Sequence, residues 1–362
     1  MIIGTRGDNM IFSLRVFPRR LFTVAIPIIL IVCVTLAFVI PFKAASEQNI
    51  ESNALASEDY IKWVDFRITS EILKYTIKLD INSQTNDIKL NFIELLSIAA
   101  VKNGGDFKST KTSAIDTIVN KINSGKQISE LVLGCEKYYN YYNETYRAAL
   151  GGFVGDYEVE VANKDGTDDT HMEMKYGVKV FSPIAKSYPY SHYDDFGNSR
   201  SYGFSRKHLG NDLLGQVGTP IVAVESGVVE AMGWNQYGGW RIGIRSLDTK
   251  RYYYYAHLRK GYPYKLGLKE GDIIQAGDVI GYMGRTGYST TEDKNNIETT
   301  HLHFGMQLIF DESQKECNNE IWINVYEVIN MLDSYRSQVA KINLETKDYE
   351  RVYEFKDLST PQ

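Results

Sequence analysis

The longest apolar run of the chain lies near its start. Residues 21–42 read LFTVAIPIILIVCVTLAFVIPF and contain no charged side chain. A run of about 20 apolar residues is long enough to cross a bilayer as one α-helix, which satisfies its backbone hydrogen bonds internally. The pattern therefore predicts a transmembrane helix over residues 21–42.

The charges beside this run predict its orientation. Four arginines lie within residues 1–20, whereas only acidic side chains carry charge between Lys43 and Tyr60. Because positive charge is retained on the cytoplasmic side, we expect residues 1–20 in the cytoplasm and the rest of the chain outside the cell membrane. A cleaved signal peptide is the alternative, since KAASEQ holds small residues. The apolar run exceeds the usual signal core, so an uncleaved single-pass anchor is favoured.

Residues 58–150 follow a helical pattern, in which apolar residues recur every three or four positions. The run from Ile68 to Leu79 has this spacing, FIELLSIAAV is a second helical segment, and residues 115–122 repeat the pattern. The stretch AAVKNGGDF resembles the region where lysozyme-like transglycosylases carry a catalytic glutamate, but Asn103 occupies that position. We therefore expect an extracytoplasmic helical spacer, or a module that docks a protein partner, rather than a second enzyme.

Strand patterns dominate the second half of the chain. After a polar hairpin or linker at residues 151–180, residues 181–332 contain short apolar segments separated by glycines, such as PIVAVESGVVEAMG and HLHFGMQLIF. This punctuation predicts an antiparallel sheet. The segment IWINVYEVINML predicts a closing helix, and residues 333–362 form a polar C-terminal tail that we expect to be loosely held. The expected fold class is α+β, a β-rich domain preceded by a transmembrane helix and a helical region.

Composition adds few constraints. The chain has 362 residues, of which 43% are hydrophobic and 23% charged, so it is long enough for two domains of ordinary globular composition. A net charge of −5 gives no reason to expect a nucleic-acid partner. Of the cysteines, Cys33 lies in the apolar run, and nothing in the sequence indicates that Cys135 and Cys317 pair.

Two of the six histidines stand in the alternating segment THLHFGMQL. Residues two apart on a strand share a face, so His301 and His303 point the same way and Leu302 points into the core. One histidine alone is more often a structural residue than a ligand, but two on one face of a packed strand favour a functional site. Strand geometry alone does not decide which of the two would bind a metal.

Other polar residues complete a candidate metal site. His208 opens the segment HLGND, in which Asp212 follows four residues later and Gly210 is expected to allow a sharp turn. Two histidines and a carboxylate suit zinc and leave a fourth position open, as in catalytic sites. His257 closes the strand-like run YYYYAHL and is expected near the metal as a non-ligand imidazole. His171 is expected to be solvated, and His192 has no usable ligand spacing.

The motifs HLGND, AHL and HLHFG, in this order, resemble the signature motifs of the M23 (lysostaphin-type, or LytM) zinc endopeptidases, which cut peptidoglycan peptides. The connecting segments VGTPIVAVESGVVEAMG and LKEGDIIQAGDVIGYMGRTGYST also resemble that family, over about residues 180–332. The resemblance implies a LytM-type sheet domain with one Zn²⁺ in a groove. It assigns the zinc ligands to His208, Asp212 and His303, and the catalytic roles to His257 and His301.

Two features depart from the family pattern. An acidic and amide-rich insertion, TEDKNNIET, precedes the last motif, and we expect it to line the cleft and to influence substrate choice. Gly305 follows the last motif where the family often has a carboxylate, a change on which the zinc site does not depend.

Two functional classes follow from the resemblance. The first is a membrane-anchored zinc endopeptidase that hydrolyses cross-links or stem peptides of peptidoglycan. The second is a non-catalytic LytM-type scaffold or activator, in cell-wall remodelling or in a sporulation channel, because some relatives have lost metal ligands. The full set of site residues is present here, so we expect the enzyme.

Overall fold

The computed structural model describes residues 60–163, 169–316, 319–343, 345 and 347–359. The expected cytoplasmic segment and the transmembrane helix at residues 21–42 lie outside the described residues. Cys317 also lies outside them, so its pairing with Cys135 stays untested. The helices of the described part are all too short or too polar to cross a membrane.

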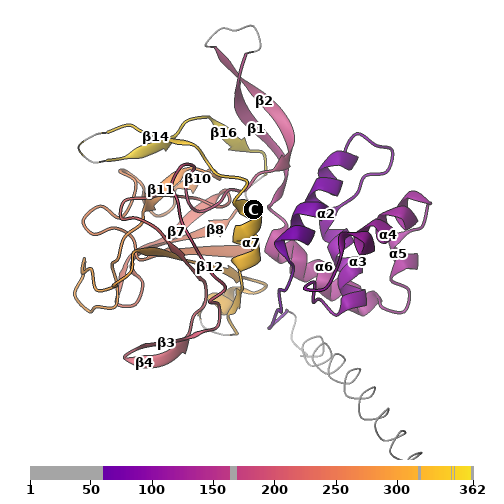
Figure 1. Cartoon of the computed structure of the whole chain (residues 1–362), viewed down its shortest axis with the longest axis horizontal. Helices are drawn as coiled ribbons and strands as arrows, with labels where there is room; N and C mark the ends of the chain where they lie inside the picture. Colours follow the sequence, from indigo (N-terminus) through magenta and orange to yellow (C-terminus); the bar gives the residue numbers. More distant parts are fainter. Residues whose placement is uncertain (1–59, 164–168, 317–318, 344, 346, 360–362) are drawn as a thin grey trace, which may run out of the picture. The chain divides into compact units, whose positions relative to one another are not determined.

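The described chain up to residue 150 is mainly helical, in the region where the spacing of apolar residues predicts helices (Figure 1). They are α2 (Ser70–Ser83), α3 (Phe92–Asn103), α4 (Thr112–Asn123), α5 (Ile128–Leu131) and α6 (Glu136–Leu150). Helix α3 begins where the Asn91 side chain accepts hydrogen bonds from the backbone N–H groups of Ile93 and Glu94. The apolar faces of these helices pack into one core, in which Leu73, Leu96 and Tyr146 are fully buried.

Asn103 closes the turn that follows α3. Its Oδ1 accepts a hydrogen bond from Gly105 N at 2.9 Å, and its Nδ2 donates to Thr110 Oγ1 at 2.9 Å. Both ends of the amide are therefore used within the turn, as expected for a structural residue rather than a catalytic one.

A seven-stranded antiparallel sheet forms the centre of the β-rich region. Its strands follow the order β10, β7, β8, β9, β12, β13, and β5 also pairs with β12. Their bounds are β5 (Asn211–Leu214), β7 (Gly227–Asn235), β8 (Gly239–Ser246), β9 (Arg251–Ala256), β10 (Ile273–Ile274), β12 (His301–Leu308) and β13 (Ile321–Ile323). The β-rich antiparallel domain beside a helical region confirms that part of the expected fold class.

Strand β12 holds the sheet in register. One edge pairs with β9 over His303–Leu308, and the other pairs first with β5 and then with β13. Leu302 and Phe304 point into the core and are at most 1% exposed. Because successive side chains alternate in direction, His301 and His303 must lie on the opposite face.

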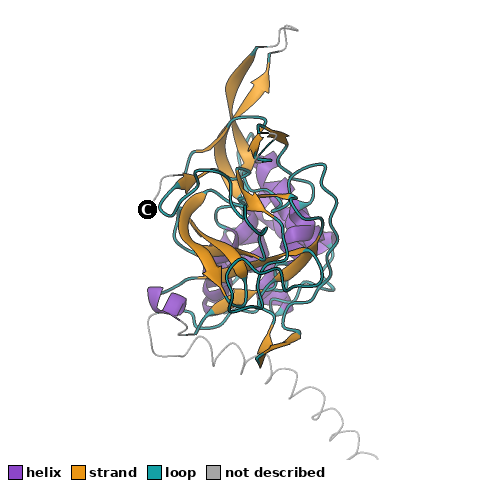
Figure 2. Ribbon diagram, turned by 90° about the vertical axis from the view of Figure 1, so that its left-hand side faces the viewer, coloured by secondary structure: helices purple, strands orange, loops and turns teal. Residues whose placement is uncertain are grey.

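Smaller elements surround this sheet. Strands β1 (Val154–Ala162) and β2 (Thr170–Val178) form a long hairpin whose far end extends away from the seven-stranded sheet, as both views show (Figures 1 and 2). Strand β3 (Ser199–Tyr202) pairs with β4 (Phe204–Lys207), and β6 (Pro220–Val222) pairs with β11 (Val279–Tyr282). Helix α7 (Tyr326–Leu332) follows β13, where the sequence predicts a closing helix.

The C-terminal segment differs from the loosely held tail that its polarity suggests. Its strands β14 (Val339–Lys341) and β15 (Tyr349–Arg351) pair with each other, and β16 (Phe355–Asp357) pairs with β1. Phe355 is buried, and Asp357 forms a buried ion pair of 2.7 Å with Lys179. A few buried side chains and backbone pairing hold the tail despite its polar composition, which is why its composition alone was misleading.

Candidate metal centre

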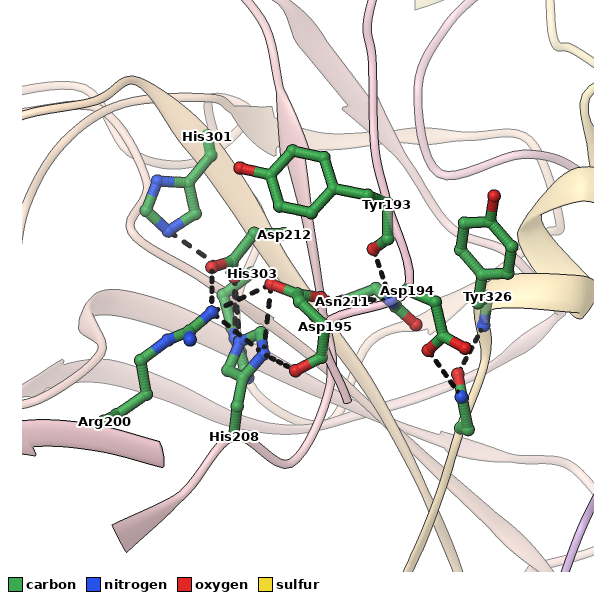
Figure 3. A network of polar contacts seen from close by, with 11 residues as sticks. Tyr193, Asp194, Asp195, Arg200, His208, Asn211, Asp212, His301, His303 and Tyr326 are labelled. Atoms are coloured by element: carbon green, nitrogen blue, oxygen red, sulfur yellow. Dashed lines mark hydrogen bonds and ion pairs between the residues drawn. The ribbon is translucent and has the colours of Figure 1, made fainter. Parts of the chain in front are cut away.

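The candidate metal centre lies where β5 and β12 pair. His303 stands directly opposite Asp212, and His208 lies just before β5. His208 Nε2 is 2.8 Å from His303 Nδ1 and 2.9 Å from Asp212 Oδ1, while His303 Nδ1 and Asp212 Oδ1 are 3.2 Å apart. Figure 3 shows these side chains converging, with His301 beside Asp212.

The three donor atoms fit a zinc ion. Ligand atoms about 2.0–2.2 Å from a tetrahedral zinc lie about 3.3–3.5 Å from one another. The separations of 2.8–3.2 Å found here need only a small expansion to reach that geometry. Two imidazole nitrogens and one carboxylate oxygen are also a usual zinc donor set, and they leave a fourth coordination position free.

Burial and mutual hydrogen bonding together shift the pKa values of the three groups. Burial lowers the pKa of His208, but hydrogen bonds to Asp195 and Asp212 outweigh burial and raise it to about 9. Burial raises the pKa of Asp212, yet hydrogen bonds with His208 and His303 keep it well below its usual range. Burial lowers the pKa of His303. A strongly ionised carboxylate beside two imidazoles is suited to hold a cation.

Asp195 and Arg200 are not among the three candidate metal ligands, but they hold the His208 ring in place. His208 Nδ1 donates to the backbone oxygen of Asp195 at 3.1 Å and lies 3.2 Å from its Oδ2. Arg200 Nη2 donates to Asp195 Oδ2 at 2.8 Å and to Asp212 Oδ2 at 3.2 Å. These contacts direct Nε2 of His208 towards Asp212. Sequence reasoning missed both residues, since the acid–arginine spacing in DDFGNSR is common in surface loops.

The chain bends at Gly210, as expected, although its φ lies outside the left-handed region. A Cβ built on Gly210 would lie 2.6 Å from the backbone oxygen of Phe304 and 2.8 Å from the ring of His303. The glycine is therefore needed so that the chain can pass close to the His303 ring.

His257 and His301 are held in the same way beside the candidate metal centre, each through its Nδ1 atom. His257 Nδ1 donates to the carbonyl oxygen of Thr286 at 2.9 Å, and His301 Nδ1 donates to that of Thr299 at 2.8 Å. A carbonyl oxygen can only accept, so the other ring nitrogen, Nε2, is left for the site in both residues. The two ring centres are 4.8 Å apart, and burial lowers the pKa of His257 well below its usual value.

A pocket of about 660 Å³, called the metal pocket here, is lined by all five residues of the predicted site: His208, Asp212, His257, His301 and His303. Asn296, Ile297, Glu298 and Thr299 line it too, so the insertion lines the cleft as expected. None of the insertion's carboxylates belongs to the described cluster of metal-ligating groups. Asp293 instead anchors the loop, because its Oδ1 accepts hydrogen bonds of 2.8 Å from Trp240 Nε1 and from Gly261 N.

The remaining histidines lie elsewhere. His171 is an exposed residue of β2 whose Nδ1 contacts Asn163 Oδ1 at 2.6 Å. His192 Nε2 lies 3.1 Å from Asn330 Oδ1, and its ring packs against Tyr326. Both contacts are structural, and neither residue lines the metal pocket.

Comparisons with known proteins relate this part of the chain to one peptidase family. Residues 206–317 match the model of peptidase family M23. The catalytic domain of the antimicrobial peptidase lysostaphin from Staphylococcus simulans is 34% identical, over 34% of this chain and 85% of that domain, with a TM-score of 0.28. We refer to residues 206–317, which match this family model, as the M23 region. They hold His208, Asp212 and His303 of the candidate metal centre together with His257 and His301.

Two other relatives match different shares of the chain. The L-Ala--D-Glu endopeptidase of Bacillus subtilis is 39% identical over 124 residues, which are 34% of this chain and 36% of that protein. A putative glycyl-glycine endopeptidase lytM from Ruminococcus gnavus is 22% identical, over 80% of this chain and 96% of that one, with a TM-score of 0.47. This chain therefore spans about a third of the length of the Bacillus protein.

Proposed function

We propose that the M23 region is a zinc endopeptidase that hydrolyses peptide bonds in the cross-links or stem peptides of peptidoglycan. The observation that carries the proposal is that all five motif residues line one pocket, with three donor atoms within 3.2 Å of one another. The M23 relatives support the substrate class, since one is an L-Ala--D-Glu endopeptidase and another a peptidoglycan DD-endopeptidase of Vibrio cholerae.

His208, Asp212 and His303 would hold the zinc ion, which when bound supplies Lewis-acid chemistry towards a carbonyl group and a water molecule. The neighbouring histidines, His257 and His301, have different roles. With its pKa well below the usual value, His257 is neutral at pH 7, so its Nε2 accepts a hydrogen bond from the attacking water and orients it. His301 Nε2, 3.6 Å from Asp212 Oδ1, takes the proton and returns it to the leaving amine.

We also propose that residues 21–42 anchor the chain in the cell membrane, with the M23 region outside. The proposal is supported by the uncharged run of residues and by the arginines that precede it. Peptidoglycan lies on that side of the membrane, so the proposed topology and the proposed substrate agree.

The test is cleavage of defined muropeptides by the full-length protein. Products would be identified by mass spectrometry, with and without a chelator. We expect peptide-bond cleavage that the chelator abolishes and that added zinc restores. Intact substrates under all conditions, or cleavage that is indifferent to the chelator, would contradict the proposal.

A further inference from the structure

A second hollow lies beside the metal pocket on the same face of the sheet. It has a volume of about 410 Å³ and shares Leu209, Tyr254 and His303 with the metal pocket. Because both hollows border these three residues, they are neighbours on the face of β12 that carries His303. The second hollow is therefore within reach of a residue next to the bond held at the metal centre.

The floor of this hollow is built by side chains that face away from the core. They are Arg241 from β8, Tyr252 and Tyr254 from β9, and Trp322 from β13. Two glycines make room for the rings. A Cβ on Gly243 would lie 1.8 Å from the Tyr252 hydroxyl, and one on Gly305 would lie 2.9 Å from the Trp322 ring. Gly305, the departure noted in the last motif, thus lets Trp322 lie over β12.

Arg241 is the unusual group in the hollow. The side chain is half-buried, and its Nε is buried without a hydrogen-bond partner. Across the described part of the chain, no carboxylate lies within 4.0 Å of its guanidinium. The Tyr252 hydroxyl is a hydrogen-bond partner of Arg241. A guanidinium has five N–H donors, so Arg241 keeps donor capacity beyond this contact.

The neighbouring groups do not neutralise Arg241. Burial raises the pKa of Tyr252 to about 12, and Arg241 only partly opposes this shift, so the phenol stays neutral at pH 7. Glu230 is paired with Arg245 at 3.6 Å and with Lys315. Glu320 accepts a hydrogen bond of 3.2 Å from Trp322 Nε1. The acidic groups around the hollow are thus engaged by other partners.

We propose that the hollow around Arg241 is a subsite that binds a carboxylate of the peptide substrate, so that the enzyme prefers peptides with an acidic residue beside the cleaved bond. The guanidinium fork matches a carboxylate, and partial burial strengthens the interaction relative to open water. The preference for peptides rests on the proposed function, whereas the binding of a carboxylate does not require turnover.

The decisive experiment compares two peptides that differ by one group. Both contain L-Ala–D-Glu that continues through one carboxyl group of the glutamate, and the other carboxyl group is free in one peptide and a carboxamide in the second. Full-length wild-type protein, Arg241→Gln and Arg241→Lys would be assayed with both. Arg67→Gln is the control, because Arg67 is an exposed arginine paired with Asp65 in the helical region.

We expect the wild type to favour the carboxylate peptide by about 10- to 100-fold in kcat/KM, the range for a hydrogen-bonded charged pair. Arg241→Gln should abolish this preference, mainly through KM, while cleavage of the carboxamide peptide stays within about threefold. Arg241→Lys should retain part of the preference, and Arg67→Gln all of it. Equal cleavage of both peptides by the wild type, or a preference that survives in Arg241→Gln, overturns the subsite.

A binding measurement separates this inference from the proposed function. The zinc-loaded His301→Ala variant, and the same variant carrying Arg241→Gln, would be titrated with both peptides by calorimetry. Tighter binding of the carboxylate peptide that depends on Arg241 supports the subsite even if the wild type cleaves neither peptide. Equal affinity for the two peptides overturns it even if the wild type is an active endopeptidase.

Discussion

His301 and His303 lie two positions apart on β12 and yet make different contacts. His303 Nδ1 joins the donor triangle with His208 and Asp212, whereas His301 Nδ1 is bonded to the carbonyl oxygen of Thr299. Only one ring thus has a nitrogen within the triangle of donor atoms. The two histidines should therefore respond differently to substitution.

We expect His303→Ala to be purified with little zinc and no activity, because it removes one of three ligands. His301→Ala should keep about one zinc per chain and lose about 10²- to 10⁴-fold in rate, the usual contribution of a group that transfers protons. Metal analysis and peptide cleavage would be measured together. His171→Ala, at an exposed histidine of β2, is the control and should change neither. Equal zinc loss in the His301 and His303 variants would make His301 a ligand.

The raised pKa of His208 predicts how metal binding depends on pH. In the metal-free protein this pKa is about 9, so at pH 7 His208 carries a proton that must leave before a metal can bind. The apparent zinc affinity should rise about tenfold per pH unit towards pH 9 and level off above it. Asp195→Asn, which removes a charge that raises this pKa, should shift the levelling point to lower pH. An affinity that is flat between pH 7 and 9 would show that His208 is already neutral.

At the scale of elements, Arg251 connects the sheet to the helices. This fully buried residue begins β9 and pairs with Glu225 at 2.8 Å. Its Nη1 also donates to the carbonyl oxygens of Arg147 and Ala148, at the C-terminal end of α6. One side chain thus satisfies backbone groups that end the helix and neutralises a buried carboxylate.

Arg251→Met should lower the free energy of unfolding by about 3–5 kcal/mol, since it leaves Glu225 buried without its partner. Urea denaturation of the full-length protein would measure the change. The double variant Glu225→Met, Arg251→Met should recover part of the loss, because it removes both charges. Lys265→Met, in a partly exposed pair with Glu350, should cost at most about 1 kcal/mol. A similar small loss for Arg251→Met would rule out the connecting role.

The insertion before β12 should set substrate choice without holding the metal. Replacing Asn296 and Glu298 with alanine should change the relative kcat/KM of two muropeptides on the order of tenfold, since both residues line the pocket. Zinc content should be unchanged. These two substitutions are a more specific test than shortening the loop. A shorter loop would also lose the contacts of Asp293 with Trp240 and Gly261. Loss of zinc in the double variant would mean that the loop supports the metal site directly.

At the scale of the whole molecule, the charge bias around residues 21–42 predicts the topology. Protease added outside intact protoplasts should digest the chain beyond about residue 50 and spare a tag at the amino terminus. Immunodetection of the tag and of the M23 region would follow both ends. Protection of the M23 region would place it inside the cell and remove the proposed substrate from its reach.

The sequence by itself determined the local features of this protein. A period of two fixes which residues of a strand share a face, so the common face of His301 and His303 and the inward direction of Leu302 could be predicted. A period of three to four likewise located α2, α3 and α4, whereas α5 and α6 were covered only by the bounds of the helical region. His208, Asp212 and His257 could also be identified as site residues from the sequence, because the motifs that contain them are recognised by their order along the chain.

Only the tertiary structure decided which atoms meet. The pairing of β5 with β12 brings together Nδ1 of His303 and Nε2 of His208. Asp195 reaches them from the loop before β3, and Arg200 from β3 itself. The tail strands and the hollow around Arg241 depend in the same way on partners distant in sequence. Local periodicity records which face a side chain occupies, but it carries no information on which distant strand lies beside it.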